Sequence, residues 1–321
     1  MFTMRFDLRV PGKTPAQIAE QYRTAIDMAQ WADDKGPFSI GLSEHHAADD
    51  GYVPSPLILA SAMAAVTRNV QFIVAAALLP MYDPVRMAED MIVLDHISQG
   101  RVSYVLGIGY RPVEYELYGL DFEKRGAIAD EKLTKLLDVL DQARQGRAMP
   151  RVTPRSFTAE RPRIMWGGAT KAAARRAARS GLAFFAQTNV PGLAETYAQA
   201  SREAGFEPGP CVLPSPEMPH IVFVHPDPDA GWKEVGPYML ADAVAYADWN
   251  KDARRPTVSL SKGRTVEELR AEHGAHRVVN VEEATALVKR WGRLPLHPLC
   301  GGCPPDLAWT YLRRVLSVPS A

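Results

Sequence analysis

The sequence is poor in cysteine, has no excess of either charge and contains no long apolar stretch. Its 321 residues include only three Cys, and 37 Lys+Arg balance 37 Asp+Glu. Three cysteines make no disulfide framework, which fits a reducing cytoplasm. Balanced charge argues against a nucleic-acid binder or a polybasic membrane-surface protein, because neither phosphates nor anionic lipids would attract the chain as a whole.

Segments that would anchor or export the chain are also missing. The longest apolar run, 72–80, is about half as long as a membrane-spanning helix needs. Residues 1–10 lack a positively charged stretch followed by an apolar core, so we expect no signal peptide. The sequence therefore predicts a globular protein with two domains or one large α/β barrel.

Short strand-like runs alternate with longer amphipathic segments. Thr14 is the expected N-cap of the first helix, and Pro237 could break the start of a later one. The alternation predicts a parallel sheet, and about eight units fit a single (β/α)8 TIM barrel with insertions over residues 1–321; a doubly wound sheet is the alternative. Strands are predicted at 5–9, 38–43, 70–78, 102–106, 163–166, 183–187, 220–224 and 295–299, and helices at 14–34, 56–67, 84–97, 127–145, 170–180, 192–204, 230–250, 281–291 and 305–317.

Three segments do not fit this alternation. The proline-rich stretches 150–162 and 208–219 are interpreted as excursion loops, and the polar segment 252–275 stays unassigned.

Cys300 and Cys303 form a Cys-x-x-Cys pair, but prolines follow at once and no second pair exists for zinc. We therefore interpret this pair as part of a loop after the last strand.

Polar residues follow the second predicted strand, where a barrel gathers its ligands. Glu44, His45 and His46 come directly after Ser43. They could transfer protons, bind a metal or simply line the rim. Adjacent histidines on an extended chain point to opposite sides and rarely share one metal, so we favour proton transfer or substrate contact by at least one of them.

Small residues follow the third and fourth strands. Ala75 and Ala76 would let a flat ligand approach the backbone, although on the residues alone a tightly packed barrel interior is the favoured explanation. Gly107 and Gly109 precede Tyr110, without the third glycine of a dinucleotide fingerprint, and the next helix is expected well downstream. We expect a loop that closes over a pocket, to which the nearby Arg111 and Glu114 are also available.

Glycines also precede the helix after the fifth strand. Gly167 and Gly168 come before Thr170 and Lys171, so backbone N–H groups at this helix start could bind a phosphate. The alternative is an ordinary helix start in which Thr170 caps its own backbone.

These motifs, in this order, resemble the luciferase-like flavin monooxygenase family. The most specific part is the segment 84–101, with its order and spacing of charged and small residues. The matching residues are Ser43-Glu44-His45-His46, Leu79-Pro80-x-x-x-Pro84-Val85-Arg86-x-Ala88-Glu89-Asp90, Leu94-Asp95-x-x-Ser98-x-Gly100-Arg101, Gly107-x-Gly109-Tyr110-Arg111-Pro112, Tyr118-Gly119 and Gly167-Gly168.

The resemblance implies a barrel that binds reduced flavin mononucleotide (FMN) across its mouth and inserts oxygen from O₂ into a small organic substrate. His45 would be the active-site histidine, with His46 and Glu44 beside it. A non-prolyl cis peptide is expected at Ala75–Ala76, under the flavin ring. Further cofactor contacts would come from Gly107, Gly109, Tyr110, Gly167, Gly168, Thr170 and Lys171.

Departures from the family pattern leave alternatives open. The reactive cysteine of true luciferases falls on Gly107 and their phosphate-binding arginine on Ile108, so light emission is not implied. The deazaflavin coenzyme F420, which transfers hydride, stays an alternative, although Glu44-His45-His46 favours FMN. A non-catalytic flavin-binding protein and a metal-dependent hydrolase are the other hypotheses.

The resemblance also suggests partners. Because no nicotinamide fingerprint is visible, reducing power would arrive from a flavin reductase or through weak NAD(P)H binding. Family members usually dimerise through the helices predicted here at 56–67 and 84–97, so we expect a homodimer. The substrate's identity does not follow from the sequence.

Overall fold

The computed structural model describes residues 1–146, 148–251 and 260–319. Eight parallel strands form one curved sheet, in the order β10-β1-β2-β3-β4-β5-β6-β7, and two more form a separate parallel pair, β8-β9. The strands are β1 (Phe2–Phe6), β2 (Phe38–Leu42), β3 (Gln71–Leu78), β4 (Val102–Gly107), β5 (Arg163–Gly168), β6 (Ala183–Ala186), β7 (Cys211–Val212), β8 (Ile221–Val224), β9 (His276–Val279) and β10 (Leu294–Leu296).

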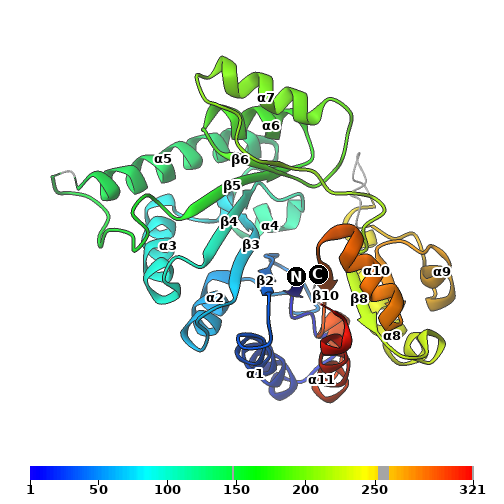
Figure 1. The fold of residues 1–321 in the computed structure, drawn as a ribbon. Helices are drawn as coiled ribbons and strands as arrows, with labels where there is room; N and C mark the ends of the chain where they lie inside the picture. The colour runs from blue at the N-terminus through cyan, green and yellow to red at the C-terminus, as the bar shows by residue number, and fades with distance from the viewer. Residues whose placement is uncertain (147, 252–259, 320–321) are drawn as a thin grey trace.

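Helices surround this sheet, as Figure 1 shows, and β8 lies beside β10 at the end of the ring. The predicted (β/α)8 barrel architecture is thus confirmed. The helices are α1 (Pro15–Ala32), α2 (Pro56–Ala65), α3 (Pro84–Ser98), α4 (Pro112–Leu117), α5 (Arg125–Gln145), α6 (Lys171–Arg179), α7 (Leu193–Glu203), α8 (Pro228–Trp249), α9 (Val266–Ala271), α10 (Val281–Trp291) and α11 (Pro305–Arg314), with short 3₁₀ turns at Leu79–Met81, Phe122–Lys124, Cys300–Gly302 and Val315–Ser317.

Local signals explain why these elements form where they do. Thr14 caps α1 in a reciprocal arrangement with Gln17, as its sequence predicts. The helix predicted at 127–145 forms as α5 and is amphipathic, since its residues Leu133, Leu136 and Leu140 are buried. None of the described helices is both long and apolar enough to cross a lipid bilayer.

The structure corrects four expectations. Helix α8 continues through Pro237, because buried residues on either side of the proline hold both halves against the core. Helix α4 begins at Pro112, directly after the Gly107–Tyr110 loop and not well downstream. The excursion loop 208–219 contains β7, and the unassigned segment 252–275 contains α9, while residues 252–259 lie outside the described residues.

The sequence analysis also missed strand β9. Its apolar run is short and directly follows a polar segment, so it gives no clear strand pattern. It pairs in parallel with β8, with Ile221 opposite His276. This pair positions α8, whose C-terminal end reaches the mouth of the barrel.

Candidate active site

The carboxyl end of β2 presents His45 to a buried carboxylate. His45 Nδ1 lies 2.7 Å from Glu114 Oε1, and the same oxygen accepts the backbone N–H of His46 at 3.0 Å. Arg111 donates to the carbonyl oxygens of His46 and Ala47, at 2.5 and 3.1 Å, and lies 3.5 Å from Glu114. Helix α4, which begins just after Arg111, therefore holds the loop after β2 in place.

The second histidine faces a different carboxylate. His46 Nε2 lies 2.8 Å from Glu44 Oε1, and the other oxygen of Glu44 accepts the N–H of Leu78 and the hydroxyl of Tyr82, at 3.1 and 2.9 Å. The hydroxyl of Tyr118 lies 3.3 Å from His46 Nδ1. The two imidazoles thus point to opposite sides, as expected for neighbours on an extended chain, and they do not converge on one metal.

Burial and pairing set the protonation of the first pair. Burial lowers the pKa of His45 below its ordinary value, and the hydrogen bond to Glu114 only partly opposes this. Burial would raise the pKa of Glu114, but the hydrogen bond from His45 and the charge of Arg111 lower it overall. Because an ionised Glu114 can only accept, His45 Nδ1 carries the proton and Nε2 keeps its lone pair at neutral pH.

In the second pair, His46 and Glu44, the pKa of the carboxylate shifts in the other direction. Burial raises the pKa of Glu44, although hydrogen bonds from His46, Tyr82 and Leu78 oppose it. Glu44 is fully buried and tied to β3 through Leu78. This pair therefore fixes the end of β2 against β3, while His45 is the group with an available basic nitrogen.

Small residues line the carboxyl ends of β3, β4 and β5. A Cβ added to Gly107 would lie 3.1 Å from the Cβ of Ala76, and one added to Gly167 would lie 2.8 Å from Val105. The peptide bond Ala75–Ala76 is cis, as the family resemblance implies. These strand ends therefore pack closely and offer backbone, without bulky side chains, to a flat ligand.

The predicted phosphate group lies at the start of α6. Thr170 is the N-cap of α6 and accepts the backbone N–H of Ala173 at 3.1 Å. The capping role that the sequence offered as an alternative is therefore present. The helix start is also exposed, so it stays accessible to a ligand. Gly168 has a φ of +155°, and a Cβ there would meet Ala173 at 2.5 Å. Only glycine fits where the backbone of residue 168 approaches α6 so closely. Lys171, at the first position of α6, is exposed.

Aromatic rings surround His45. The ring centroids of Tyr52, Tyr110 and Trp249 lie 4.9, 5.3 and 5.0 Å from that of His45. Tyr110 also accepts a hydrogen bond of 3.3 Å from Asn250. The sequence prediction included Tyr110, but Trp249 was missed because it comes from the far end of α8.

A buried network of charges lies beneath these rings. Arg9 pairs with Asp50 and lies 3.6 and 3.8 Å from Asp7 and Asp242, while Arg5 lies 3.4 Å from Asp242. Arg9, Asp7 and Asp242 are buried, and buried ions are tolerated only when paired. The network fixes Arg9 at the mouth of the barrel, under the aromatic rings.

One set of buried side chains in the described part of the chain has metal-ligating atoms within reach of one another. Donor atoms of Asp242, His297 and Cys300 all lie within 4.8 Å. However, the guanidinium groups of Arg5 and Arg9 already neutralise Asp242, and a divalent ion would have to sit against both. Cys300 follows β10 in a buried turn, as expected for the loop after the last strand.

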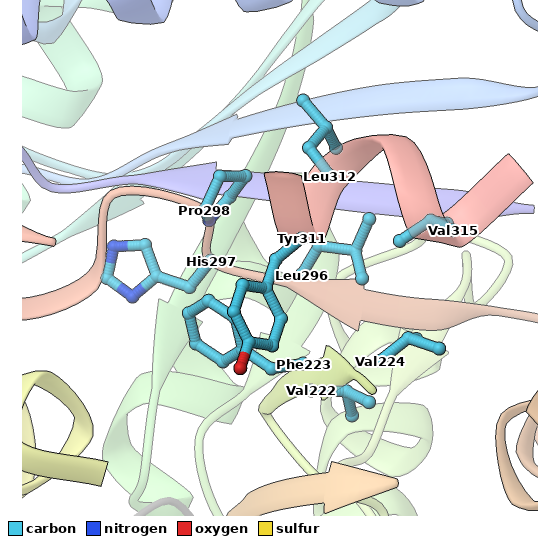
Figure 2. Close-up of a pocket in the computed structure, with 9 residues that line it drawn as sticks. All are labelled: Val222, Phe223, Val224, Leu296, His297, Pro298, Tyr311, Leu312 and Val315. Atoms are coloured by element: carbon cyan, nitrogen blue, oxygen red, sulfur yellow. The ribbon is translucent and has the colours of Figure 1, made fainter. Parts of the chain in front are cut away.

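Figure 2 shows the side chains that line a small cavity between β8, β10 and α11. Its volume is about 10 Å³, room for about one water molecule. It marks imperfect packing where the two sheets meet and is far too small for a ring system. Its lining residues are Val222, Phe223, Val224, Leu296, His297, Pro298, Tyr311, Leu312 and Val315.

The predicted site residues therefore form three groups along one edge of the sheet. Glu44, His45, His46 and Tyr110 meet around the end of β2, with Gly109 against Glu114. Ala75, Ala76 and Gly107 meet across β3 and β4, and Gly167, Gly168, Thr170 and Lys171 lie where β5 enters α6. The partner carboxylate of His45, Glu114, was predicted only as a residue of a loop.

Comparisons with known proteins bear on this arrangement. A family model described as luciferase-like monooxygenase matches residues 4–293. Protein y4vJ of Sinorhizobium fredii is 30% identical over 124 residues, which are 39% of this chain and 35% of y4vJ. N-acetyl-S-alkylcysteine monooxygenase of Bacillus subtilis is 26% identical over 198 residues, 60% of this chain and 59% of the relative. The match spans less than two thirds of either relative.

Solved structures match over nearly the whole chain. The monooxygenase RslO1 from Streptomyces bottropensis has a TM-score of 0.71 at 20% identity, covering 99% of this chain and 98% of that one. The oxygenating constituent of 3,6-diketocamphane monooxygenase of Pseudomonas putida, in complex with FMN, has a TM-score of 0.66 at 18% identity, covering 99% and 97%. An F420-dependent secondary alcohol dehydrogenase has a TM-score of 0.60 at 14% identity, covering 95% and 96%. At these identities the likeness concerns the fold.

Proposed function

The chain belongs to the luciferase-like monooxygenase family, and from this we propose that it is a flavin-dependent monooxygenase that uses reduced FMN and O₂ on a small organic substrate. The observation that carries the proposal is the buried pair of His45 and Glu114 at 2.7 Å. It provides a neutral imidazole with one basic nitrogen at the edge of the sheet where this family would bind its cofactor.

The residues at this edge fit a flavin mononucleotide. Strand β5, which carries the helix start of α6, is three strands away from β2, about 14 Å along the sheet. An extended mononucleotide can bridge such a distance, with its ring near the backbone of Ala76 and Gly107 and its phosphate at Thr170 and Lys171. A bound reduced flavin would supply the electrons and the atom that reacts with O₂.

The side chains of the chain have separate tasks in this mechanism. His45 Nε2 accepts or returns one proton close to the reacting atoms, since Glu114 holds the other ring nitrogen protonated. The aromatic rings of Tyr52 and Tyr110 exclude water around His45. Glu44, tied to His46 and Leu78, keeps this loop fixed while the proton moves.

An anaerobic titration with reduced FMN and reduced F420 tests the cofactor. We expect tight binding of reduced FMN and at least tenfold weaker binding of reduced F420, since Glu44-His45-His46 is the sequence that favours FMN. The variant His45→Asn should bind reduced FMN normally and lose about 10²–10⁴-fold in turnover. Preference for F420 would replace oxygen insertion by hydride transfer, and unchanged turnover in His45→Asn would remove the proposed role of His45.

We further propose that a second copy of the chain covers α2 and α3, and that a separate reductase supplies the reduced flavin. Ile58 on α2 is 73% exposed, and Val93 and Ile97 on α3 are 49% and 40% exposed. Large exposed apolar side chains on two adjacent helices are typical of an interface.

A further inference from the structure

The indole ring of Trp249 lies between two guanidinium groups at the mouth of the barrel. The guanidinium carbon of Arg9 is 4.1 Å from the ring centre and that of Arg111 is 4.0 Å. The same indole lies against His45, with 5.0 Å between ring centroids. A flat ring therefore occupies the space beside the candidate proton-transfer group.

Both cations are held in place by residues other than Trp249. Arg9 pairs with Asp50, and Arg111 donates to the backbone and lies beside Glu114. Arg9 is 1% exposed, and among the described residues its Nη2 atom has no hydrogen-bond partner. Asp7 and Asp242 also lie within 4 Å of Arg9, and its guanidinium carbon lies 4.9 and 4.4 Å from the ring centres of Tyr52 and Tyr246. The negative faces of aromatic rings add to this compensation, and an aromatic ring in the place of the indole would preserve that contribution.

The position of Trp249 in the chain makes its ring replaceable. Trp249 is the last residue of α8 and only partly buried. The ends of helices open at low cost in free energy, whereas Arg9 and Arg111 are buried. Tyr246 and Asn250 anchor this end of α8 through hydrogen bonds to Tyr52 and Tyr110. Displacing the indole therefore needs the Trp249 side chain to turn away, while both guanidinium groups stay with their other partners.

We propose that the substrate carries a planar, electron-rich aromatic ring that takes the place of the Trp249 indole between Arg9 and Arg111. This inference rests on the proposed function, because it places the ring that is oxidised next to His45. Two guanidinium groups attract the electron-rich face of a phenol or naphthol, do little for a saturated ring, and repel a ring that is itself cationic.

Three probes of similar size separate these cases in calorimetric titrations of the flavin-free protein. We expect 2-naphthol to bind at least tenfold more tightly than decahydro-2-naphthol and N-methylquinolinium. Equal affinity for 2-naphthol and its saturated analogue, or tighter binding of the cation, would overturn the proposal.

Two variants identify the site. Trp249→Ala removes the competing indole and should tighten 2-naphthol binding at least threefold, whereas a merely structural role would weaken it. Arg111→Lys keeps the charge but loses the planar stack, and should reduce the preference for the aromatic probe. Trp309→Ala is the control, since Trp309 also lies near an arginine, Arg313, but on α11. Unchanged or weaker naphthol binding in Trp249→Ala would refute replacement of its ring.

The flavin titration keeps this inference separate from the proposed function. If reduced FMN binds but the three probes bind alike, only the aromatic substrate is wrong. If 2-naphthol binds as expected and no flavin binds, the aromatic site is supported and the monooxygenase proposal fails.

Discussion

Two neighbouring imidazoles at the end of β2 have different environments because each faces its own carboxylate. Glu114 has a lowered pKa and keeps a negative charge beside His45, whereas Glu44 has a raised pKa and is bound into the backbone of β3. The chemical difference between His45 and His46 therefore comes from their partners: Glu44 lies in the same short motif, whereas Glu114 comes from helix α4.

Replacing Glu114 tests how His45 is tuned. The carboxylate raises the pKa of His45 against the effect of burial, so Glu114→Gln should lower that pKa further. The acidic limb of the kcat/KM profile should then move to lower pH, and turnover should fall about 10²-fold because the imidazole loses its fixed tautomer.

Glu116→Gln is the matched control, since Glu116 is exposed on the same helix α4. It should leave both the profile and the rate unchanged. A rate loss in Glu114→Gln without any movement of the acidic limb would mean that Glu114 only supports the fold.

At the scale of single elements, helix caps and the apolar faces of helices were predictable from the sequence. Contacts between different elements were not. The cap Thr14 and the amphipathic helix α5 follow from local spacing, and both were predicted. The contact of Trp249 with His45 depends on how α8 crosses the barrel, which no local pattern encodes. Helix α8 also continues through Pro237, because tertiary packing outweighs the loss of the backbone hydrogen bond that proline cannot donate.

The start of α6 allows a cap and a ligand site to be distinguished. Thr170→Ala should cost about 1 kcal/mol of stability through the lost N-cap. It should also weaken reduced FMN binding several-fold, because its hydroxyl lies at the proposed phosphate position. Chemical denaturation and the flavin titration measure the two effects.

The control for this variant is Thr265→Ala, since Thr265 caps α9 in the same way, through Glu268. It should lower stability to a similar degree and leave flavin affinity unchanged. Equal flavin affinity in both variants would show that Thr170 is only a cap.

At the scale of the whole molecule, the barrel could be predicted because its alternating pattern runs along the entire chain. The division into two sheets could not, because β7 and β9 are short and lie beside proline-rich or polar segments. The three groups of site residues could be placed at one edge, since parallel strands present their carboxyl ends together.

The proposed assembly of two copies is also a property of the whole molecule. Ile58→Glu combined with Val93→Glu would place charges in the interface and should convert a dimer to a monomer in sedimentation experiments. Leu316→Glu is the control, because Leu316 is 48% exposed in the 3₁₀ turn after α11. A native chain that is monomeric at micromolar concentration would contradict the proposal.

The separation of the two sheets determines which parts of the barrel are joined by main-chain hydrogen bonds and which by side chains. In the described part of the chain, β8 and β9 pair only with each other, so main-chain bonding does not tie them to their neighbours. Strand β2, which carries the histidines, is bonded on both sides. The unit bearing α8 is attached to the main sheet by side chains, among them Asp242 with Arg5 and Arg9, and Tyr246 with Tyr52. Main-chain bonds therefore hold the strand that carries the imidazoles, whereas side-chain contacts position Trp249 against His45.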